Sequence, residues 1–343
     1  MTKEITAYPL NKLVQLKGKP LLQREMAQPD WTLNFTKHEN QKTAGELYCS
    51  AEFTKGVHDE LIFLSVLNIF LSIAAFLGNT LILVALHKES SLHSPSKLLY
   101  RNLAITDLCV GVIAEPLTVT YWISVVSGRW NICHHAVLAV GWSGFALCSV
   151  SLFTLTAIGV DRLLALLLGL RYRQVITLKR LRITSIVFWI YSFVGGSTFI
   201  WNFAITTWCQ YIGTALCLFS TIFAYTKIFL TLRHSQIQVQ SSVSQGQRSQ
   251  AIPALNIARY RKAVYSALWV QITLVICYLP FGIAVVLISQ TELTLSSYLA
   301  WQFTITLVYL NSSLNPLLYC WRIREVRQAV KETLRQLFGC LSS

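Results

Sequence analysis

Long, uncharged apolar stretches separated by polar segments make up most of the chain. These stretches are residues 61–86, 102–126, 136–160, 263–291 and 293–321. The second carries Asp107 and Glu115, and the other four carry no charge. Each is longer than the roughly 20 residues that an apolar helix needs to cross about 30 Å of hydrocarbon. The pattern therefore predicts one membrane-spanning helix in each stretch.

A further apolar stretch, residues 183–226, is too long for a single crossing. One helix of that length would reach roughly 66 Å, about twice the hydrocarbon thickness. We therefore expect two helices, joined by a tight turn near residues 202–207. The total is seven spans, which predicts an all-α membrane protein built as a seven-transmembrane helix bundle.

Composition and charge agree with a membrane protein and give its orientation. Of the 343 residues, 54% are hydrophobic and 13% are charged, whereas soluble domains carry about a quarter charged residues. The Lys and Arg residues gather in the segments after the first, third, fifth and seventh helices, and the opposite loops hold only Arg129. Because positive loops remain inside, the amino terminus is expected outside the cell. The net charge of +14 is split among these four membrane-flanking segments, which argues against nucleic-acid binding.

Three regions follow from this topology. Residues 1–60 are expected to form a flexible extracellular tail with a glycosylation sequon at Asn34, and residues 61–321 form the bundle. Residues 322–343 place apolar side chains on one helical face and Arg and Lys opposite, which predicts an amphipathic cytoplasmic helix on the inner leaflet. Cys340, just beyond this helix, is a candidate for palmitoylation. The polar residues 235–250 are expected to form a flexible loop.

Three of the nine cysteines lie on the expected outer side, where disulfides form. They are Cys49, Cys133 and Cys209. The sequence allows a bond from Cys133 either to Cys209 or to Cys49.

Asp161 and Arg162 are the charged residues at the inner end of the third helix. An arginine facing lipid at mid-membrane costs roughly 2.5 to 3.5 kcal/mol on insertion scales, and less near the interface, so Arg162 needs a partner. Asp161 can supply one as a local ion pair, which by itself is as good an explanation as a functional role.

Several motifs that follow one another along the chain favour a functional role for this pair. They are "GNTLILVAL" from Gly78, "NLAITDL" from Asn102, "DRL" from Asp161, Trp189, "CYLPF" from Cys277 and "NSSLNPLLY" from Asn311. Together they resemble the rhodopsin-like (class A) G-protein-coupled receptors over about residues 61–338. Helix five lacks a proline and the loop before it is very short. Both features are similar to the melanocortin, adenosine, cannabinoid and lysophospholipid receptor group.

The resemblance implies an activation switch at the inner end of the bundle. Arg162 would be held inward at rest and would meet Tyr225, Tyr319 and a heterotrimeric G protein when helix six swings outward. Pro280 and Pro316 remove backbone donors inside their helices and so create bends, which are either passive kinks or pivots. Tyr278 stands where the family commonly has tryptophan, and Asn315 precedes the second bend. Arrestin is a further implied partner.

Tyr260 stands where the family often carries an acid on helix six that locks the arginine. We therefore expect Asp161 to be the residue that restrains Arg162, and we predict signalling without ligand.

Asp107 is expected to be a buried carboxylate that faces polar groups on neighbouring helices. The family holds sodium at the matching positions, which are Asn79, Asp107, Ser151, Asn311 and Asn315. A structural polar network without an ion is the alternative. In either case Asp107 should face the interior of the bundle.

The sequence says less about the ligand than about the activation switch. Gly144 occupies the position where amine receptors carry an aspartate, and Tyr309 the position of the retinal-bearing lysine of opsins, so an amine and retinal are disfavoured. Glu115 is either a ligand counter-ion or a protonated residue within the bundle. The outward lining is expected to be apolar and aromatic, which suits a peptide, a lipid or a small molecule, and ordinary helix packing is the alternative. Its residues are Phe145, Cys148, Phe281, Val285, Trp301, Ile305 and Tyr309.

The sequence thus predicts a multi-pass receptor of the plasma membrane that binds an extracellular ligand and activates a G protein. A proton- or ion-coupled transporter is the alternative, but such proteins usually show repeat symmetry and paired broken helices, and these spans show neither. An enzyme is disfavoured, because the chain has no metal-binding or nucleophile motif of the common kinds.

Overall fold

The computed structural model describes residues 48–54, 56–88, 94–201, 203–244, 269, 272–288, 294–322 and 324–341. Residues 43–343 form one compact unit, which contains all the described residues, and residues 1–42 form a second. Asn34 and Tyr260 lie outside the described residues, so the glycosylation sequon and the missing acidic lock remain sequence predictions.

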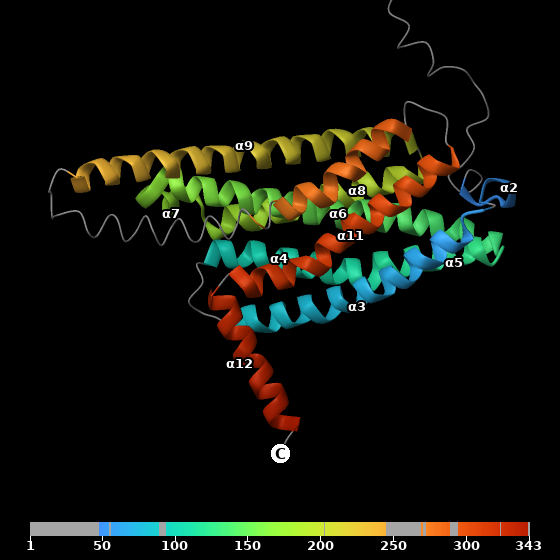
Figure 1. Cartoon of the computed structure of the whole chain (residues 1–343), viewed down its shortest axis with the longest axis horizontal. Coiled ribbons are helices and arrows are strands. Elements are labelled where there is room, and N and C mark those ends of the chain that lie inside the picture. The colour runs from blue at the N-terminus through green and yellow to red at the C-terminus, as the bar shows by residue number, and fades with distance from the viewer. Residues whose placement is uncertain are drawn as a thin grey trace, which may run out of the picture. The chain divides into compact units, whose positions relative to one another are not determined.

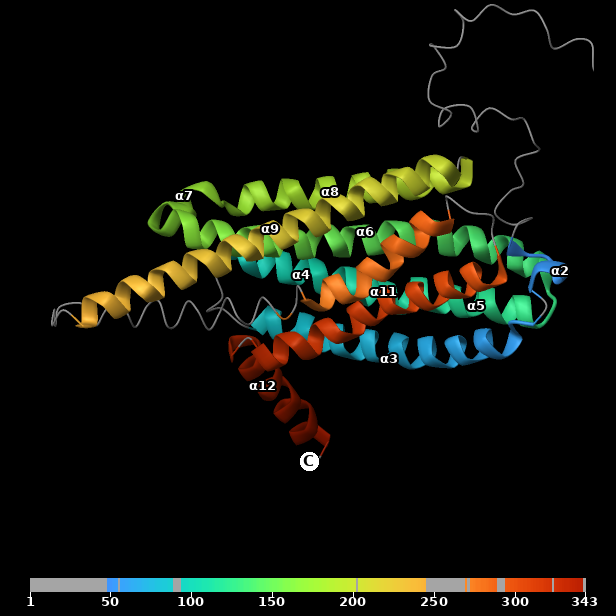
Figure 2. The same ribbon diagram turned by 45° about the horizontal axis from the view of Figure 1, so that its top comes forward.

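All the described secondary structure is helical. The short elements are α2 (Ala51–Thr54), η3 (Val110–Ala114), η4 (Gly169–Arg171) and α7 (Tyr172–Val175). The longer helices are α3 (His58–Lys88), α4 (Ser94–Cys109), α5 (Glu115–Val126), α6 (Trp130–Leu168), α8 (Leu178–Trp201), α9 (Phe203–Ser244), α11 (Leu295–Arg322) and α12 (Arg324–Leu341). A further helix runs from Ile272 to Ile288. The long helices of the bundle lie side by side, and α12 leaves the end of α11 at an angle (Figures 1 and 2).

Within the part of the chain that the structure describes, five helices are long and apolar enough to cross a membrane, as judged by length and composition. They are His58–Lys88, Pro95–Val126, Trp130–Leu168, Leu178–Ile200 and Ile205–His234. These helices contain the predicted apolar cores and extend several residues beyond most of them. The predicted division of residues 183–226 agrees with the structure, because α8 ends at Trp201 and α9 begins at Phe203.

The second span is continuous but contains a π-helical turn, η3, between α4 and α5. Pro116 follows directly in the first turn of α5. A proline inside a helix lacks an N–H and crowds the preceding turn, and a wider turn relieves that crowding. The turn also packs tightly on α3, where the Ser72 hydroxyl donates to the carbonyl of Gly111 at 2.6 Å.

The prediction of a loop at residues 235–250 is wrong for the first part of that range, because α9 continues to Ser244. The stretch up to that residue contains no glycine or proline, and glutamine is a good helix former. A polar helix can therefore continue past the end of the apolar segment.

The bundle is apolar on its outside and carries polar groups inside. Large apolar side chains such as Phe70 and Phe219 are exposed, at 66% and 71% respectively. Asn79, Asp107 and Asn315 are fully buried. This distribution suits a protein surrounded by lipid, in which polar side chains bind one another between helices.

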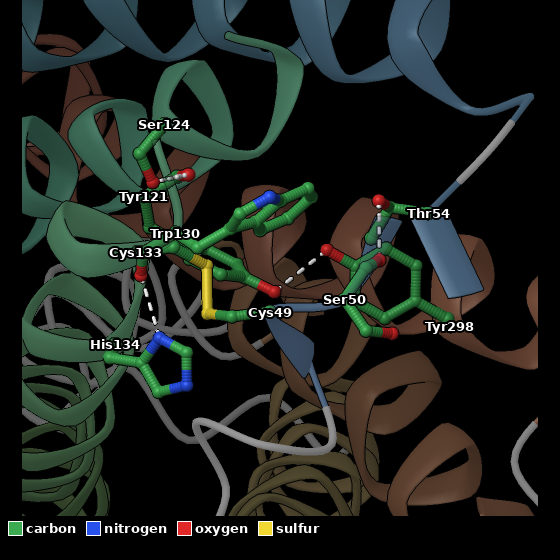
Figure 3. The surroundings of a disulfide bond; sticks show 9 residues. All are labelled: Cys49, Ser50, Thr54, Tyr121, Ser124, Trp130, Cys133, His134 and Tyr298. Carbon is green, nitrogen blue, oxygen red and sulfur yellow. Dashed lines mark hydrogen bonds between the residues drawn. A yellow bond between two sulfur atoms is a disulfide. The ribbon is translucent and has the colours of Figure 1, made fainter. Parts of the chain in front are cut away.

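One end of the bundle is closed by residues that precede the first span. Cys49 forms a disulfide with Cys133 near the start of α6, with a Cα–Cα distance of 5.9 Å. Figure 3 shows this bond beside the hydrogen bond between the hydroxyls of Tyr121 and Tyr298, which are 2.8 Å apart. We call this the disulfide end. The structure thus selects Cys49 from the two partners that the sequence allowed, and Cys209 is a free cysteine on α9.

The amphipathic segment after α11 forms the helix α12. Ala329 and Val330 of its apolar face are buried in the core of the bundle, together with Ile82 and Leu86 of α3. Part of the face predicted to rest on lipid is therefore covered by protein. Cys340 lies within this helix, rather than beyond it as predicted.

Candidate functional site

Arg162 lies near the last turns of α6, about 29 residues after Cys133, which places it roughly 44 Å from the disulfide end along the helix. Its guanidinium Nη2 is 2.8 Å from Asp161 Oδ2, and Asp161 is nearly buried, with 3% of its side chain exposed. Nη2 also donates to Ser96 Oγ of α4 at 2.5 Å. The Ser96 hydroxyl in turn donates to Asp161 Oδ2 at 3.2 Å.

Tyr172 completes this group from the segment that follows α6. Its hydroxyl donates to Asp161 Oδ1 at 2.6 Å. Burial and this hydrogen bond to Asp161 raise the pKa of Tyr172 from 10.0 to about 12, so the phenol remains a donor at neutral pH. We call Arg162, Asp161, Ser96 and Tyr172 the arginine cluster.

The expectation that Asp161 by itself restrains Arg162 is therefore wrong. Ser96 binds both members of the pair, and Tyr172 fixes the other oxygen of the carboxylate. Sequence reasoning missed both residues because each reaches the pair from a different element. The spacing of the motifs does not show which hydroxyl of α4 faces α6.

Two tyrosines predicted to join the switch are buried near this end of the bundle. Tyr225 packs with Leu163 and Ile228 in a small apolar cluster between α6 and α9. The ring of Tyr319 meets that of Tyr100 edge-on, with 5.2 Å between ring centroids. The hydroxyl of Tyr319 has no hydrogen-bond partner among the described residues.

Asp107 is the centre of a polar network in the middle of the bundle. Its carboxylate accepts hydrogen bonds from Asn315 Nδ2 at 2.7 Å, Ser312 Oγ at 2.9 Å and Ser151 Oγ at 3.0 Å. Ser151 and Asn315 belong to the set expected from sequence, whereas Ser312 was not predicted. Asn79 reaches the network indirectly, because its Nδ2 donates to the carbonyl of Ser312 at 3.1 Å.

The residues around Asp107 fit a small hard cation in chemical type. Such ions take oxygen ligands, and the side-chain oxygens of Asn79, Asn311 and Asn315 are buried without a hydrogen-bond donor among the described residues. One carboxylate with neutral oxygens suits a monovalent ion. The described residues contain no group of three or more His, Cys, Asp and Glu side chains of the kind that holds a transition metal.

Nearer the disulfide end, a cavity of about 190 Å³ lies among α5, α6, α8, α9, α11 and the helix Ile272–Ile288. All seven outward residues expected from the sequence line it. They are Phe145, Cys148, Phe281, Val285, Trp301, Ile305 and Tyr309. Tyr48, next to the disulfide, also lines the cavity, although the sequence placed it in the flexible tail.

The comparisons with known proteins agree with this arrangement. A family model described as "7 transmembrane receptor (rhodopsin family)" matches residues 78–211 and 195–319. The chain belongs to this family. It functions as a G-protein-coupled receptor and is a multi-pass membrane protein.

Similar curated proteins are receptors of several ligand types. Adenosine receptor A2a of Canis lupus familiaris is 27% identical over 303 residues, which cover 77% of this chain and 70% of that receptor. Melanocortin receptor 4 of Danio rerio is 24% identical over 84% of this chain and 88% of its own length. Trace amine-associated receptor 9 of Homo sapiens is 25% identical over 79% of this chain and 83% of its own length.

Glu115 is the predicted ligand residue that the structure does not bring to the cavity of the receptor. It is fully buried, and it is not among the lining residues. Its two carboxylate oxygens have no hydrogen-bond partner among the described residues. The second interpretation, a residue held within the bundle, matches this placement. The extra residue in the π turn η3 changes which way the residues after it face, and the apolar pattern of the span does not predict that turn.

Tyr278 connects the cavity to the inner half of the receptor. Its hydroxyl donates to the carbonyl of Cys148 at 3.2 Å, and Cys148 is itself a lining residue. Pro280 lies two residues further along the same helix. This contact joins α6 at the cavity wall to the helix that carries Pro280.

Proposed function

We propose that seven helices of this receptor span the membrane: the five apolar helices, the helix Ile272–Ile288 and α11. The amino terminus would be extracellular, and α12 would lie at the cytoplasmic surface. In this proposal residues 1–60 lie outside the cell, residues 61–321 form the bundle and residues 322–343 form the cytoplasmic helix and tail. The excess of Lys and Arg in the segments at the Arg162 end supports this orientation.

The receptor would bind an extracellular ligand in the cavity and activate a heterotrimeric G protein at the Arg162 end. The arginine cluster is the observation that carries this proposal. Arg162 donates hydrogen bonds to Asp161 and Ser96. A partner protein can replace these hydrogen bonds with its own. A ligand that binds the outward-swung state more tightly shifts the population toward it and so releases Arg162.

Helix-six movement would connect the two sites. The Tyr278 contact with Cys148 and the bend at Pro280 lie between the cavity and the inner end of the helix Ile272–Ile288. Outward movement of that end would let Arg162 meet Tyr225, Tyr319 and the G protein, with arrestin as a second partner of the same surface. Asn315 and Pro316 provide a corresponding hinge on α11.

Asp107 would hold a sodium ion with oxygens of Asn79, Ser151, Asn311 and Asn315. The bound ion supplies positive charge to the buried carboxylate. Hydrogen bonds from Ser312 and Asn315 orient that carboxylate in the structure.

The similar receptors are named for adenosine, melanocortin and trace amines, and these names do not fix the ligand here. Gly144 lines the cavity where amine receptors carry an acid, so an amine would lack its counter-charge. The transporter alternative receives no support from the comparisons, because the similar proteins are receptors.

The test is nucleotide exchange on a purified G protein by the receptor in lipid nanodiscs. We expect exchange above that of empty nanodiscs without any added ligand. Arg162→Ala should reduce exchange to the empty-nanodisc level. Arg129→Ala, an exposed arginine at the other end of α6, is the matched control and should leave exchange unchanged. Full coupling by a correctly folded Arg162→Ala receptor would overturn the proposal.

A further inference from the structure

Glu115 is a buried carboxyl group that the proposed function does not use. It begins α5 directly after the π turn η3, and none of its surface is exposed. Both of its carboxylate oxygens are shielded from solvent and have no hydrogen-bond partner among the described residues. An ionised carboxylate can only accept hydrogen bonds, and burying one without donors is strongly unfavourable. A cation must therefore compensate the negative charge, or a proton must remove it.

Contacts between helices place Glu115 at a junction of α3, α5 and α11. The hydroxyl of Ser72 on α3 donates to the carbonyl of Gly111, and the first two spans run in opposite directions (Figure 1). Asn68 lies one turn before Ser72, and Glu115 lies one turn after Gly111, so these two side chains are at the same level. Asn68 in turn binds Thr306 of α11 at 3.0 Å.

The polar hydrogens at this junction are already used. Asn68 Nδ2 donates to a carbonyl of its own helix at 2.9 Å and to Thr306 Oγ1 at 3.0 Å. The hydroxyl of Thr118 donates to a carbonyl of its own helix at 2.8 Å, so the phenol of Tyr309 is the donor in their 3.0 Å contact. Asn68 Oδ1, by contrast, is a buried acceptor to which no described group donates. The junction thus lacks a donor for Glu115 and has room for one more proton.

The groups around Glu115 favour a proton over a metal ion. The carboxyl interacts electrostatically with Asp107 of α4, Cys148 of α6 and Tyr309 of α11. The thiol and the phenol are neutral groups in water near pH 7, whereas a second carboxylate repels the first. Helix α3 carries its ionisable side chains only at its two ends. A hard metal ion takes about six oxygen ligands, but a proton needs a single acceptor, which Asn68 supplies.

We propose that Glu115 is a proton-binding site of the resting receptor, and that release of this proton favours the signalling state. The neutral acid donates to Asn68 Oδ1 in the described packing, in which Arg162 is bound to Asp161. An ionised Glu115 needs donors, and the nearby ones are the groups that tie α11 to α3 and α5. Ionisation therefore loosens α11. Because the resting packing binds one more proton than the loosened state, it is favoured at low pH and lost as the pH rises. This inference rests on the proposed function, since it names a regulation of the same receptor.

The first measurement asks whether Glu115 carries a proton. Infrared difference spectra between the parent receptor and Glu115→Gln, in nanodiscs at about pH 7, should contain the carbonyl band of a neutral carboxylic acid. Asp59→Asn, at an exposed acid in the first turn of α3, is the matched control, and its difference spectrum should contain carboxylate bands instead. Carboxylate bands in the Glu115→Gln difference spectrum would overturn the inference.

The second measurement compares nucleotide exchange by the parent receptor and by Glu115→Gln, whose amide keeps the shape and the neutral charge of the protonated acid. The ratio of the parent rate to the variant rate, taken with the same G protein at each pH, should increase about threefold or more between about pH 6 and pH 8.5. One proton limits the increase to about tenfold per pH unit. Sodium is held constant, because an ion at Asp107 would change the charge near Glu115. The Asp59→Asn receptor should follow the parent, and a ratio that is constant or falls with pH would overturn the inference.

Thermal unfolding in the same nanodiscs measures the proton without a G protein. The folded receptor holds a proton that an unfolded chain releases near pH 4.3, roughly the value for glutamate in water. The unfolding midpoint of the parent should therefore fall relative to that of Glu115→Gln as the pH rises. Glu115→Met, which is neutral and of similar size, replaces Glu115→Gln in all three measurements should that variant fail to fold. Equal changes of the midpoint in the parent and in a folded variant would reject the proton site.

Failure of this inference can be separated from failure of the proposed function. The infrared and unfolding measurements need no G protein and should give the same results in the Arg162→Ala receptor. Exchange that depends on Arg162 but has the same pH profile in the parent and in Glu115→Gln would reject the inference and leave the proposed function standing. A neutral carboxyl band and the expected change of the midpoint, without any nucleotide exchange, would reject the proposed function and leave the proton site standing.

Discussion

Ser96 joins the two charges of the arginine cluster through one hydroxyl. It accepts from Arg162 and donates to Asp161, so it orders both side chains at once. A hydrogen bond to a charged group is usually worth more than one between neutral groups. Loss of this hydroxyl should therefore favour the state in which Arg162 is released.

Ser96→Ala should raise ligand-free nucleotide exchange by about two- to fivefold, because the resting state loses about 1 kcal/mol of stabilisation. The measurement is exchange at matched receptor concentration in nanodiscs. Ser65→Ala is the control, since the hydroxyl of Ser65 donates to the carbonyl of Leu61 in its own helix. Exchange in Ser96→Ala at or below the parent level would contradict the role given to this hydroxyl.

At the scale of helices, α3 and α11 approach closely at Gly78. A Cβ atom at this position would lie 2.9 Å from Cγ of Pro316, closer than real Cβ contacts. The proline ring is rigid, so the two helices would have to separate. Small residues commonly allow such close approach between membrane helices. The contact also packs α3 against Pro316, the proline inside α11 that follows Asn315.

Gly78→Ala should lower the stability of the folded receptor by about 1–3 kcal/mol through overpacking. The measurement is the midpoint of thermal unfolding in detergent. Gly213→Ala is a matched control, because its nearest neighbour would lie 3.8 Å away. This variant should be neutral or more stable by up to about 1 kcal/mol, since alanine favours helix over glycine. A Gly78→Ala receptor as stable as Gly213→Ala would refute the close contact.

At the scale of the whole molecule, the disulfide joins residues 84 positions apart and ties the segment before α3 to α6. Cross-linking such a long loop restricts the unfolded chain. The same bond holds Cys49 next to Tyr48, a lining residue of the cavity, so it bears on both stability and the candidate site. Cys209, the other partner that the sequence allowed, is free on α9.

Cys49→Ala and Cys133→Ala should each lower stability by about 2–4 kcal/mol, and the double variant should be no less stable than either one. The measurement is thermal unfolding under non-reducing conditions. Cys209→Ala should have little effect. A large loss in Cys209→Ala combined with none in Cys49→Ala would indicate the other pairing.

Much of the candidate site could be predicted from sequence, because motif residues mark positions along each helix. The seven expected lining residues all reach the cavity, and Ser151 and Asn315 bind Asp107. Ser312, Ser96 and Tyr172 were missed. Each is a common hydroxyl residue, and its role depends on how its helix is rotated toward a neighbour.

The sequence by itself predicted the apolar helices, most of their approximate ends and the family. Hydrocarbon thickness sets the length of an apolar helix, and an ionisable side chain within that thickness is costly. The tertiary structure alone decided the partner of Cys133, the presence of Tyr48 in the cavity lining and the burial of Glu115 outside that lining. These depend on contacts between distant segments and on one π turn that re-aims the following residues, and the apolar pattern along a single helix does not record either.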